Sequence, residues 1–132
     1  MRSETIPPPR ENDLLTAKVI GFAIEVHRTL GPGLSESAYE ECLCFELRQN
    51  ALVFKRQVYL PIIYKSVKVD CGYRLDIVIE DRIIVELKTV ERLMPIHEAQ
   101  ILTYLKLSGI RTGLLLNFNS AVLKDGMRRL ML

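Results

Sequence analysis

Two apolar runs between Cys71 and Lys88, in the stretch CGYRLDIVIEDRIIVELK, contain three ionisable side chains that could do chemistry. Asp76 lies in the first run, and Glu86 and Lys88 lie in the second. Charges are rarely placed inside apolar strands without a partner, because leaving water costs them free energy. Two carboxylates beside an ammonium group could share a proton, bind a cation or form an ion pair. Which of these applies depends on whether the three side chains face one another.

The apolar pattern predicts how the two strands pair. Alternate residues are apolar in both runs, and a one-residue slip would turn every side chain to the opposite face. Only one register puts both apolar sets on the same face, and its pairs are 75 with 87, 77 with 85 and 79 with 83. In this register Asp76 lies directly opposite Glu86, and Arg74 lies opposite Lys88.

Opposed residues on paired strands have Cβ atoms about 5 Å apart, and two carboxylates at that distance repel each other. A shared proton with one strongly raised pKa would compensate, as would a hard divalent cation such as Mg²⁺ or a salt bridge from Arg74 or Lys88. Alternatively, the face is open to solvent and the charges are ordinary surface residues. Val78 and Ile84 lie on the same face, however, which predicts that it is at least partly covered.

The elements that must position these residues follow from apolar spacing and chain breaks. Helices are expected from Asp13, as a plausible N-cap, to near Leu30; from about Glu36 to Asn50, with Ser35 as N-cap; and from Pro95 to about Leu107. Strands are expected over 54–64 with a bend or edge at Pro61, over 67–69 continuing as 73–79, and over 83–88, 112–118 and 127–132.

The element order α-α-β-β-β-α-β-(β) predicts an α/β or α+β fold in which helices flank a mixed β-sheet. The polar residues 1–12 contain three successive prolines and are expected to form a flexible tail, with 13–132 as a single domain. Such a domain would place the three ionisable residues on neighbouring strands beneath a helical layer.

Composition narrows the function classes. The formal net charge is +2, so any nucleic-acid binding must use a local basic patch. No apolar run approaches the roughly 20 residues of a membrane helix, and no signal-peptide pattern is present, so we expect a cytoplasmic protein. The three cysteines have no framework spacing and are expected to be reduced, mostly buried thiols. The absence of GxGxxG, P-loop and HExxH motifs argues against nucleotide-binding and zinc-protease functions.

The pattern D…ExK, formed by Asp76 and Glu86-Leu87-Lys88 on adjacent strands, resembles the PD-(D/E)xK nuclease superfamily, which has a restriction-endonuclease-like fold. The resemblance covers roughly residues 13–118, although Leu75 stands where the superfamily name has Pro. Gly33 to Tyr39, GLSESAY, fits the GxxExxY signature of a small group placed in that superfamily. Gln100 and Tyr104 fit the QxxxY element of RecB-like nucleases.

The resemblance implies a metal-dependent nuclease that hydrolyses DNA or RNA through a metal-activated water. Asp76, Glu86 and the backbone carbonyl of Leu87 would bind Mg²⁺ or Mn²⁺, and Lys88 would orient the attacking water. Glu36 would be an additional metal or water ligand, with Glu40 as the alternative.

Further contacts with the nucleic acid are expected on the third predicted helix. The resemblance implies that Gln100 and Tyr104 support the site or touch the nucleic-acid backbone. His97, three residues before Gln100, could share that helix face and contact nucleic acid, although an ordinary surface or partly buried histidine is the simpler interpretation.

Two alternatives remain open from the sequence. The same fold could serve as a non-catalytic nucleic-acid-binding or scaffold subunit. The long apolar strands are also compatible with a homodimer.

Overall fold

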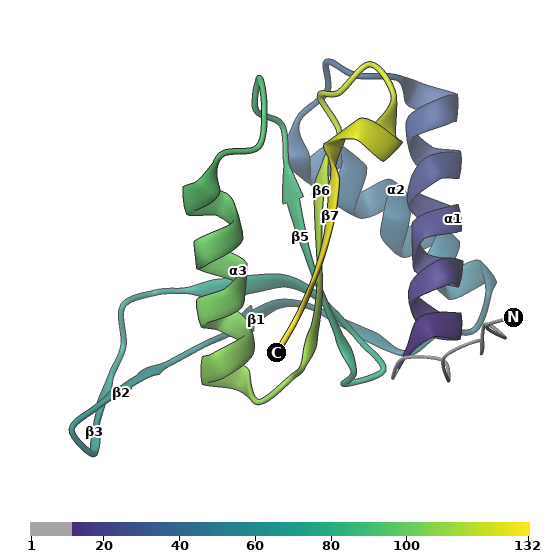
Figure 1. Ribbon diagram of the computed structural model, residues 1–132. Coiled ribbons are helices and arrows are strands. Elements are labelled where there is room, and N and C mark those ends of the chain that lie inside the picture. Colours follow the sequence, from purple (N-terminus) through teal and green to yellow (C-terminus); the bar gives the residue numbers. More distant parts are fainter. Residues whose placement is uncertain (1–11) are drawn as a thin grey trace, which may run out of the picture.

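A computed structural model describes residues 12–132, in which three helices pack on a five-stranded sheet (Figure 1). The helices are α1 (Asp13–Leu30), α2 (Glu36–Gln49) and α3 (Pro95–Ser108), and a short 3₁₀ helix, η1 (Leu123–Gly126), precedes the last strand. The sheet has the order β1 (Phe54–Tyr59), β4 (Arg74–Ile79), β5 (Ile83–Lys88), β6 (Thr112–Asn117) and β7 (Met127–Met131). Only β5 and β6 are parallel, so the sheet is mixed, as predicted.

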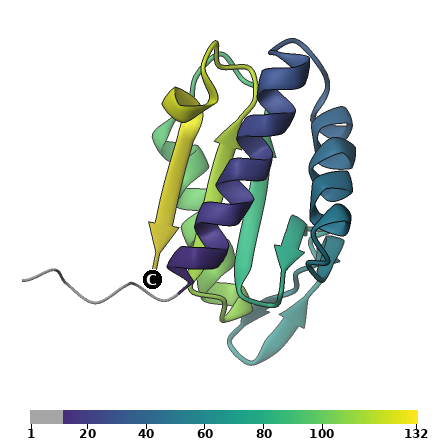
Figure 2. The same ribbon diagram turned by 90° about the vertical axis from the view of Figure 1, so that its right-hand side faces the viewer.

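The helices cover both faces of the sheet, as Figures 1 and 2 show from two sides. α1 and α2 pack on one face, where β4, β5 and β6 contribute buried residues such as Ile77, Val85 and Leu114. α3 packs on the other, where Leu105 joins Val78 and Ile84. Because both faces of β5 and β6 are covered, these strands are apolar almost throughout. An ionisable residue inside β5 is therefore necessarily buried.

Local signals set the helix ends. The Ser35 Oγ accepts a hydrogen bond from the Ala38 N–H at 3.3 Å, which confirms Ser35 as the N-cap of α2. α3 begins at Pro95 and ends before Gly109, whose left-handed φ of 77° favours glycine. Asp13 is not the cap of α1: the preceding Asn12 takes that position, and Asp13 is the first helical residue.

The stretch predicted as one strand over 54–64 is broken at Leu60–Pro61, the position of the expected bend. The second piece, β2 (Ile62–Tyr64), pairs only with β3 (Val67–Val69) in a separate two-stranded sheet. β3 is therefore not the start of β4. We call residues 61–72 the arm, because this hairpin projects from the body of the molecule (Figure 1). Cys44 is buried and Cys42 half-buried, but Cys71 on the arm is exposed, contrary to the expectation of mostly buried thiols.

The predicted tail lies outside the described residues except for Asn12, which exchanges hydrogen bonds with Arg82 in the turn between β4 and β5. Among residues 12–132, no helix combines the length and apolar character needed to cross a membrane.

Candidate active site

The predicted register of β4 and β5 is confirmed up to the point where the carboxylates begin. Ile79 pairs with Ile83, and the ladder continues to Ile77 and Val85, where it ends. Beyond it, side chains replace the backbone pairing. The Asp76 N–H donates to Glu86 Oε1 at 3.2 Å, and the Leu87 N–H donates to Asp76 Oδ2 at 2.8 Å.

The two carboxyl groups are therefore adjacent, and each is fixed by the strand that carries the other. Two other predicted pairs, Leu75 with Leu87 and Arg74 with Lys88, are not formed. Arg74 pairs with Tyr59 of β1, and its guanidinium lies 5.0 Å from the centre of that ring instead of facing Lys88.

The strands separate here because the side-chain alternation shifts at one place on two strands. Leu75 was expected to share a face with Ile77 and Ile79, but it packs on the α3 side of the sheet, whereas they pack on the α1 and α2 side. On β1 the matching position is Gln57, which has a left-handed φ of 49°. Neither Gln57 nor Asp76 belongs to the β1–β4 ladder, although the pairs on either side of them are formed.

A non-glycine residue in this conformation costs of order 1–3 kcal/mol. The shift turns Asp76 away from the regular pleat, so that its carboxylate lies at the border between the two faces of the sheet.

A buried ion pair supports the distorted strand from α2. The Arg56 guanidinium donates to Glu40 Oε2 through Nη2 at 2.7 Å and through Nε at 3.2 Å, and to Glu41 Oε1 at 2.7 Å. These carboxylates raise the pKa of Arg56, and Arg56 in turn lowers the pKa of Glu41. The Gln57 amide donates to Glu40 Oε1 at 2.8 Å and reaches Asp76 Oδ1 at 3.5 Å. This network links α2, β1 and the Asp76 carboxylate.

A cleft of about 270 Å³ opens between α2 and this part of the sheet. Its lining residues are Glu36, Ser37, Glu40, Gln57, Asp76 and Leu87. The two candidate helix carboxylates differ in their surroundings. Glu40 is buried and held by Arg56 and Gln57, whereas Glu36 is exposed and forms no hydrogen bond or ion pair with the residues that the structure describes. Of the two helix carboxylates, Glu36 is thus the one that is not held by other described residues.

Glu86 is the buried member of the carboxylate pair, with 6% of its surface exposed. Burial raises its pKa to about 8, and the Asp76 carboxylate adds to the rise. Lys88 acts in the opposite direction but is the smallest of these influences. Within residues 12–132, neither Arg74 nor Lys88 forms a salt bridge to the pair. Of the three possible compensations, the salt bridge is thus not formed, and the raised pKa of Glu86 favours a proton on that carboxyl group.

Comparison with known proteins identifies the family of this chain. The family model of the PD-(D/E)XK nuclease superfamily matches residues 13–130, which is nearly all of the described chain. The chain belongs to the PD-(D/E)XK nuclease superfamily. No significant match was found among curated proteins or among solved structures. The three helices and mixed five-stranded sheet agree with the restriction-endonuclease-like fold of this superfamily.

Nucleases of the PD-(D/E)XK superfamily generally use divalent metal ions, and the donor chemistry here fits such an ion. Asp76, Glu86 and the Leu87 carbonyl supply hard oxygen donors, which Mg²⁺ and Mn²⁺ prefer. Each carboxylate uses one oxygen for the cross-strand bond from a backbone N–H, and the second Asp76 oxygen also accepts the 3.5 Å bond from Gln57. Side chains alone do not complete a site: among the described residues, no three His, Cys, Asp or Glu residues group in a way that could hold a metal ion.

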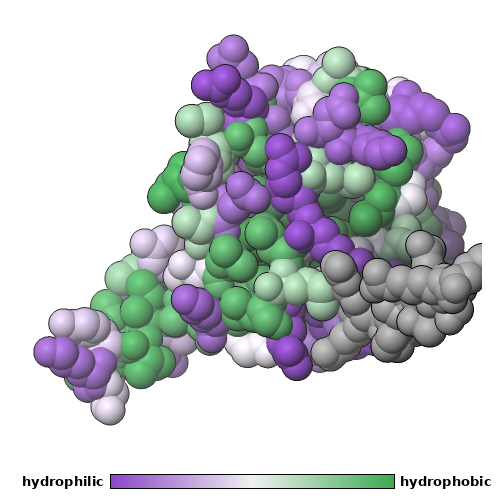
Figure 3. Space-filling model, in the orientation of Figure 1, coloured by the Kyte–Doolittle hydropathy of each residue, from purple (hydrophilic) through white to green (hydrophobic). Residues whose placement is uncertain are grey.

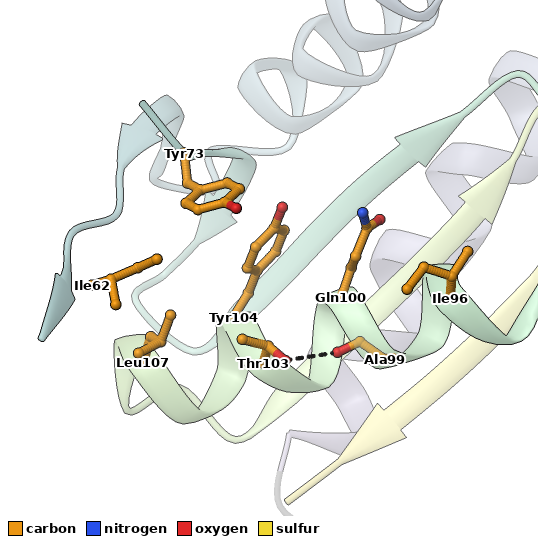
Figure 4. Close-up of a pocket in the computed structure, with 8 residues that line it drawn as sticks. All are labelled: Ile62, Tyr73, Ile96, Ala99, Gln100, Thr103, Tyr104 and Leu107. Carbon is orange, nitrogen blue, oxygen red and sulfur yellow. Dashed lines mark hydrogen bonds between the residues drawn. The ribbon is translucent and has the colours of Figure 1, made fainter. Parts of the chain in front are cut away.

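Gln100 and Tyr104, the predicted QxxxY residues, lie together in a groove on the other side of the sheet. The groove has a volume of about 200 Å³ and lies between α3 and the base of the arm (Figure 4). Figure 4 shows both side chains on the same face of α3, with the Tyr104 ring beside Tyr73. Burial raises the pKa of Tyr104, and the carboxylates of Glu86 and Asp76 add to the effect. Neither carboxylate lines the groove itself, so Tyr104 is the groove residue on which their charge acts.

The histidines have structural contacts. His97 does not line the groove with Gln100. Its Nδ1 accepts a hydrogen bond from the Met94 N–H at 2.8 Å, at the start of α3. His27 is buried, and its Nε2 lies 2.7 Å from the Ser120 carbonyl oxygen.

Two residues of the site were not identified from the sequence. The Gln57 amide donates a hydrogen bond to Asp76. Nothing about a polar residue in a predicted strand indicates that its backbone is left-handed. Asn117, fully buried beside Lys88, exchanges hydrogen bonds with the backbone of Val90 and thereby holds the chain that leaves β5. Arg56 pairs with Glu40 and Glu41. The sequence did contain an indication of the Arg56–Glu40 ion pair. Glu40 falls on the buried face of α2, and a buried carboxylate requires a cation.

Proposed function

We propose that this protein is a Mg²⁺- or Mn²⁺-dependent nuclease that hydrolyses phosphodiester bonds of DNA or RNA. The observation that carries the proposal is the Asp76–Glu86 pair. The two carboxyl groups lie side by side where β4 and β5 separate, and Lys88 follows two residues after Glu86 on β5. A structural role alone would not require a half-buried and a buried acid to be adjacent, because like charges destabilise paired strands.

Each residue has a part in the proposed reaction. A divalent ion held by Asp76, Glu86 and the Leu87 carbonyl would supply Lewis-acid assistance and lower the pKa of a bound water. The half-buried Lys88 ammonium would stabilise negative charge as it develops at the phosphate, an effect that is strongest where water is excluded. Glu36, exposed on the wall of the cleft, would accept hydrogen bonds from water or ligands there.

We also propose membership of the GxxExxY group. The motif has a structural explanation here. Gly33 has a left-handed φ of 105°, and the Tyr39 hydroxyl donates to the Gly31 carbonyl at 2.5 Å and accepts from the Leu34 N–H at 3.2 Å. The spacing of the motif thus closes the loop between α1 and α2 and places Glu36 in the first turn of α2.

The test is cleavage of single- and double-stranded DNA and RNA with Mg²⁺, Mn²⁺ or EDTA. Lys88→Ala should abolish cutting without unfolding the protein, and Lys18→Ala, an exposed lysine on α1, is the matched control. Asp76→Asn should abolish both cutting and metal binding measured by calorimetry. An Asp76→Asn protein as active as the wild type would refute the proposal. Nucleic-acid binding without cutting under any metal would favour a non-catalytic binding subunit.

A further inference from the structure

The arm has a surface that the fold does not require. Ile63, Tyr64 and Val67 are each about three-fifths exposed, at 58%, 62% and 60%. An isolated two-stranded hairpin is at best marginally stable in water, so these residues contribute little to the stability of the body. Figure 3 shows the arm as a hydrophobic patch that ends in a hydrophilic tip and projects beyond the rest of the surface.

The arm and its base carry more basic than acidic residues. Lys65 and Lys68 lie on the hairpin and Arg74 lies at its base, against one acidic residue, Asp70, whose Oδ1 accepts a hydrogen bond from the Gly72 N–H at 2.9 Å. Lys65 and Ser66 form the tip, both with left-handed φ values of 48° and 67°, as a tight two-residue hairpin turn requires. The tip therefore presents a lysine at the end of the arm.

The cations of the arm lie beside aromatic rings. Lys65 Nζ is 5.5 Å from the centre of the Tyr64 ring, and Lys68 Nζ is 5.7 Å from that of Tyr59. Rings with adjacent cations are the combination that binds single-stranded nucleic acid, because the rings stack on bases and the cations contact phosphates.

The aromatic surface continues from the arm onto α3. Tyr73, 43% exposed, lies 6.2 Å from Tyr104 between ring centres, and both line the groove between the arm and α3 (Figure 4). The groove is lined mostly by apolar side chains and no charged ones. Its volume of about 200 Å³ suits a single planar ring and is too small for a double helix to enter.

We infer that the arm and this groove bind an unpaired nucleic-acid strand, with Tyr64 and Tyr73 stacking on bases and Lys65 and Lys68 contacting phosphates. This inference rests on the proposed nuclease function and names its substrate class. An unpaired strand fits because a base can stack on tyrosine only if its face is free, whereas both faces are covered within a duplex. A strand held in this way runs past Tyr104 toward Asp76 and Glu86.

The experiment measures binding in EDTA, where metal-dependent cutting cannot occur. A fluorescent single-stranded oligonucleotide, as DNA and as RNA, is titrated with protein and followed by anisotropy, in parallel with the same strand annealed to its complement. The single strand should bind more tightly than the duplex. Tyr64→Ala and Tyr73→Ala should each weaken single-strand binding about 5- to 150-fold, and Tyr64→Phe, which keeps the ring, should not. Phe45→Ala is the matched control, since Phe45 is 54% exposed on α2, on the opposite face of the sheet.

The lysines give an independent readout. Replacing Lys65 and Lys68 together with alanine should reduce the slope of log Kd against log salt by about 1.4, since each phosphate contact to a single strand contributes about 0.7. The tyrosine variants should leave that slope unchanged.

Three results would overturn the inference: duplex binding as tight as single-strand binding, tyrosine variants that behave like Phe45→Ala, or an arm whose variants alter only self-association of the chain. The nuclease proposal fails separately. Arm-dependent binding of single strands without cutting would refute the nuclease function alone, and cutting unaffected by the arm variants would refute only the role of the arm.

Discussion

The buried Glu86 carboxyl makes folding stability depend on pH in the direction opposite to that of most acidic residues. Its pKa is raised from 4.5 to about 8 by burial and by the neighbouring Asp76. Between these values the folded chain retains a proton that the unfolded chain has released. The free energy of unfolding therefore falls as the pH rises, and the contribution of this proton, complete below about pH 4.5, is lost by about pH 8.

The size of the effect follows from the interval between the two pKa values. The difference between about 8 and 4.5 is about 3.5. At about 1.4 kcal/mol for each pH unit, the free energy of unfolding changes by at most about 5 kcal/mol. Total stabilities of 5–15 kcal/mol are usual, so the metal-free protein should be markedly less stable at pH 8 than at pH 5.

Glu86→Gln isolates this contribution because glutamine has nearly the same shape, does not titrate and can still accept the Asp76 N–H. Urea unfolding in EDTA at about pH 5 and about pH 8 should show a steep loss of stability in the wild type and a smaller loss in the variant. The difference between the two proteins should change by several kcal/mol across that range. Other titrating groups are common to both proteins and cancel in the comparison.

A difference between wild type and Glu86→Gln that stays constant from pH 5 to pH 8 would refute the reasoning, because it would mean that Glu86 is ionised in the folded protein throughout. Added Mg²⁺ provides a second check. At pH 8 it should stabilise the wild type in proportion to the logarithm of its concentration and leave the variant nearly unchanged.

Three further predictions concern the surroundings of the site, and each is measured by urea unfolding. Arg56→Ala leaves the buried Glu40 carboxylate without its cation and should lower the free energy of unfolding by about 2 kcal/mol. This is less than the roughly 3–5 kcal/mol for a fully buried pair, because Arg56 is 29% exposed. The double variant with Glu40→Gln should recover part of the loss. Gln57→Gly should be about 1 kcal/mol more stable than Gln57→Ala, because only glycine adopts the left-handed φ of 49° without strain; equal stabilities would contradict that strain. Gly113→Ala places a Cβ 2.8 Å from Ile101 Cδ1 and should cost about 1–2 kcal/mol, and Ile101→Val, which removes that methyl group, should restore part of the loss.

Much of the fold could be predicted because local signals agree with one another. The apolar alternation of β4 and β5 permits one register, and the structure has that register at Ile77–Val85 and at the two pairs after it. Ser35 and Pro95 mark helix starts because their chemistry suits those positions. The adjacency of Asp76 and Glu86 followed from the register alone.

The faces of the sheet could not be predicted near Asp76. In a regular pleat, residues 75, 77 and 79 share a face, and nothing in the residue types signals that the alternation shifts. The shift depends on two strands distorted at matching positions, Gln57 and Asp76, which are 19 residues apart along the chain. Tertiary contacts from α2 hold this distortion, so it is a property of the assembled fold and not of either strand.

Because of the distortion, the Asp76 carboxylate can act on both sides of the sheet. In a regular pleat, Asp76 and Glu86 would both point toward α3, and the cleft under α2 would contain only Glu36 and Glu40. Because the alternation shifts, Asp76 lines that cleft while its charge still acts on Tyr104 across the sheet. Backbone strain of this kind persists where the surrounding structure holds it in place, and it is concentrated at functional sites. The strained Gln57 and the separated strands thus have a common origin: both belong to the shift that brings Asp76 into the cleft under α2.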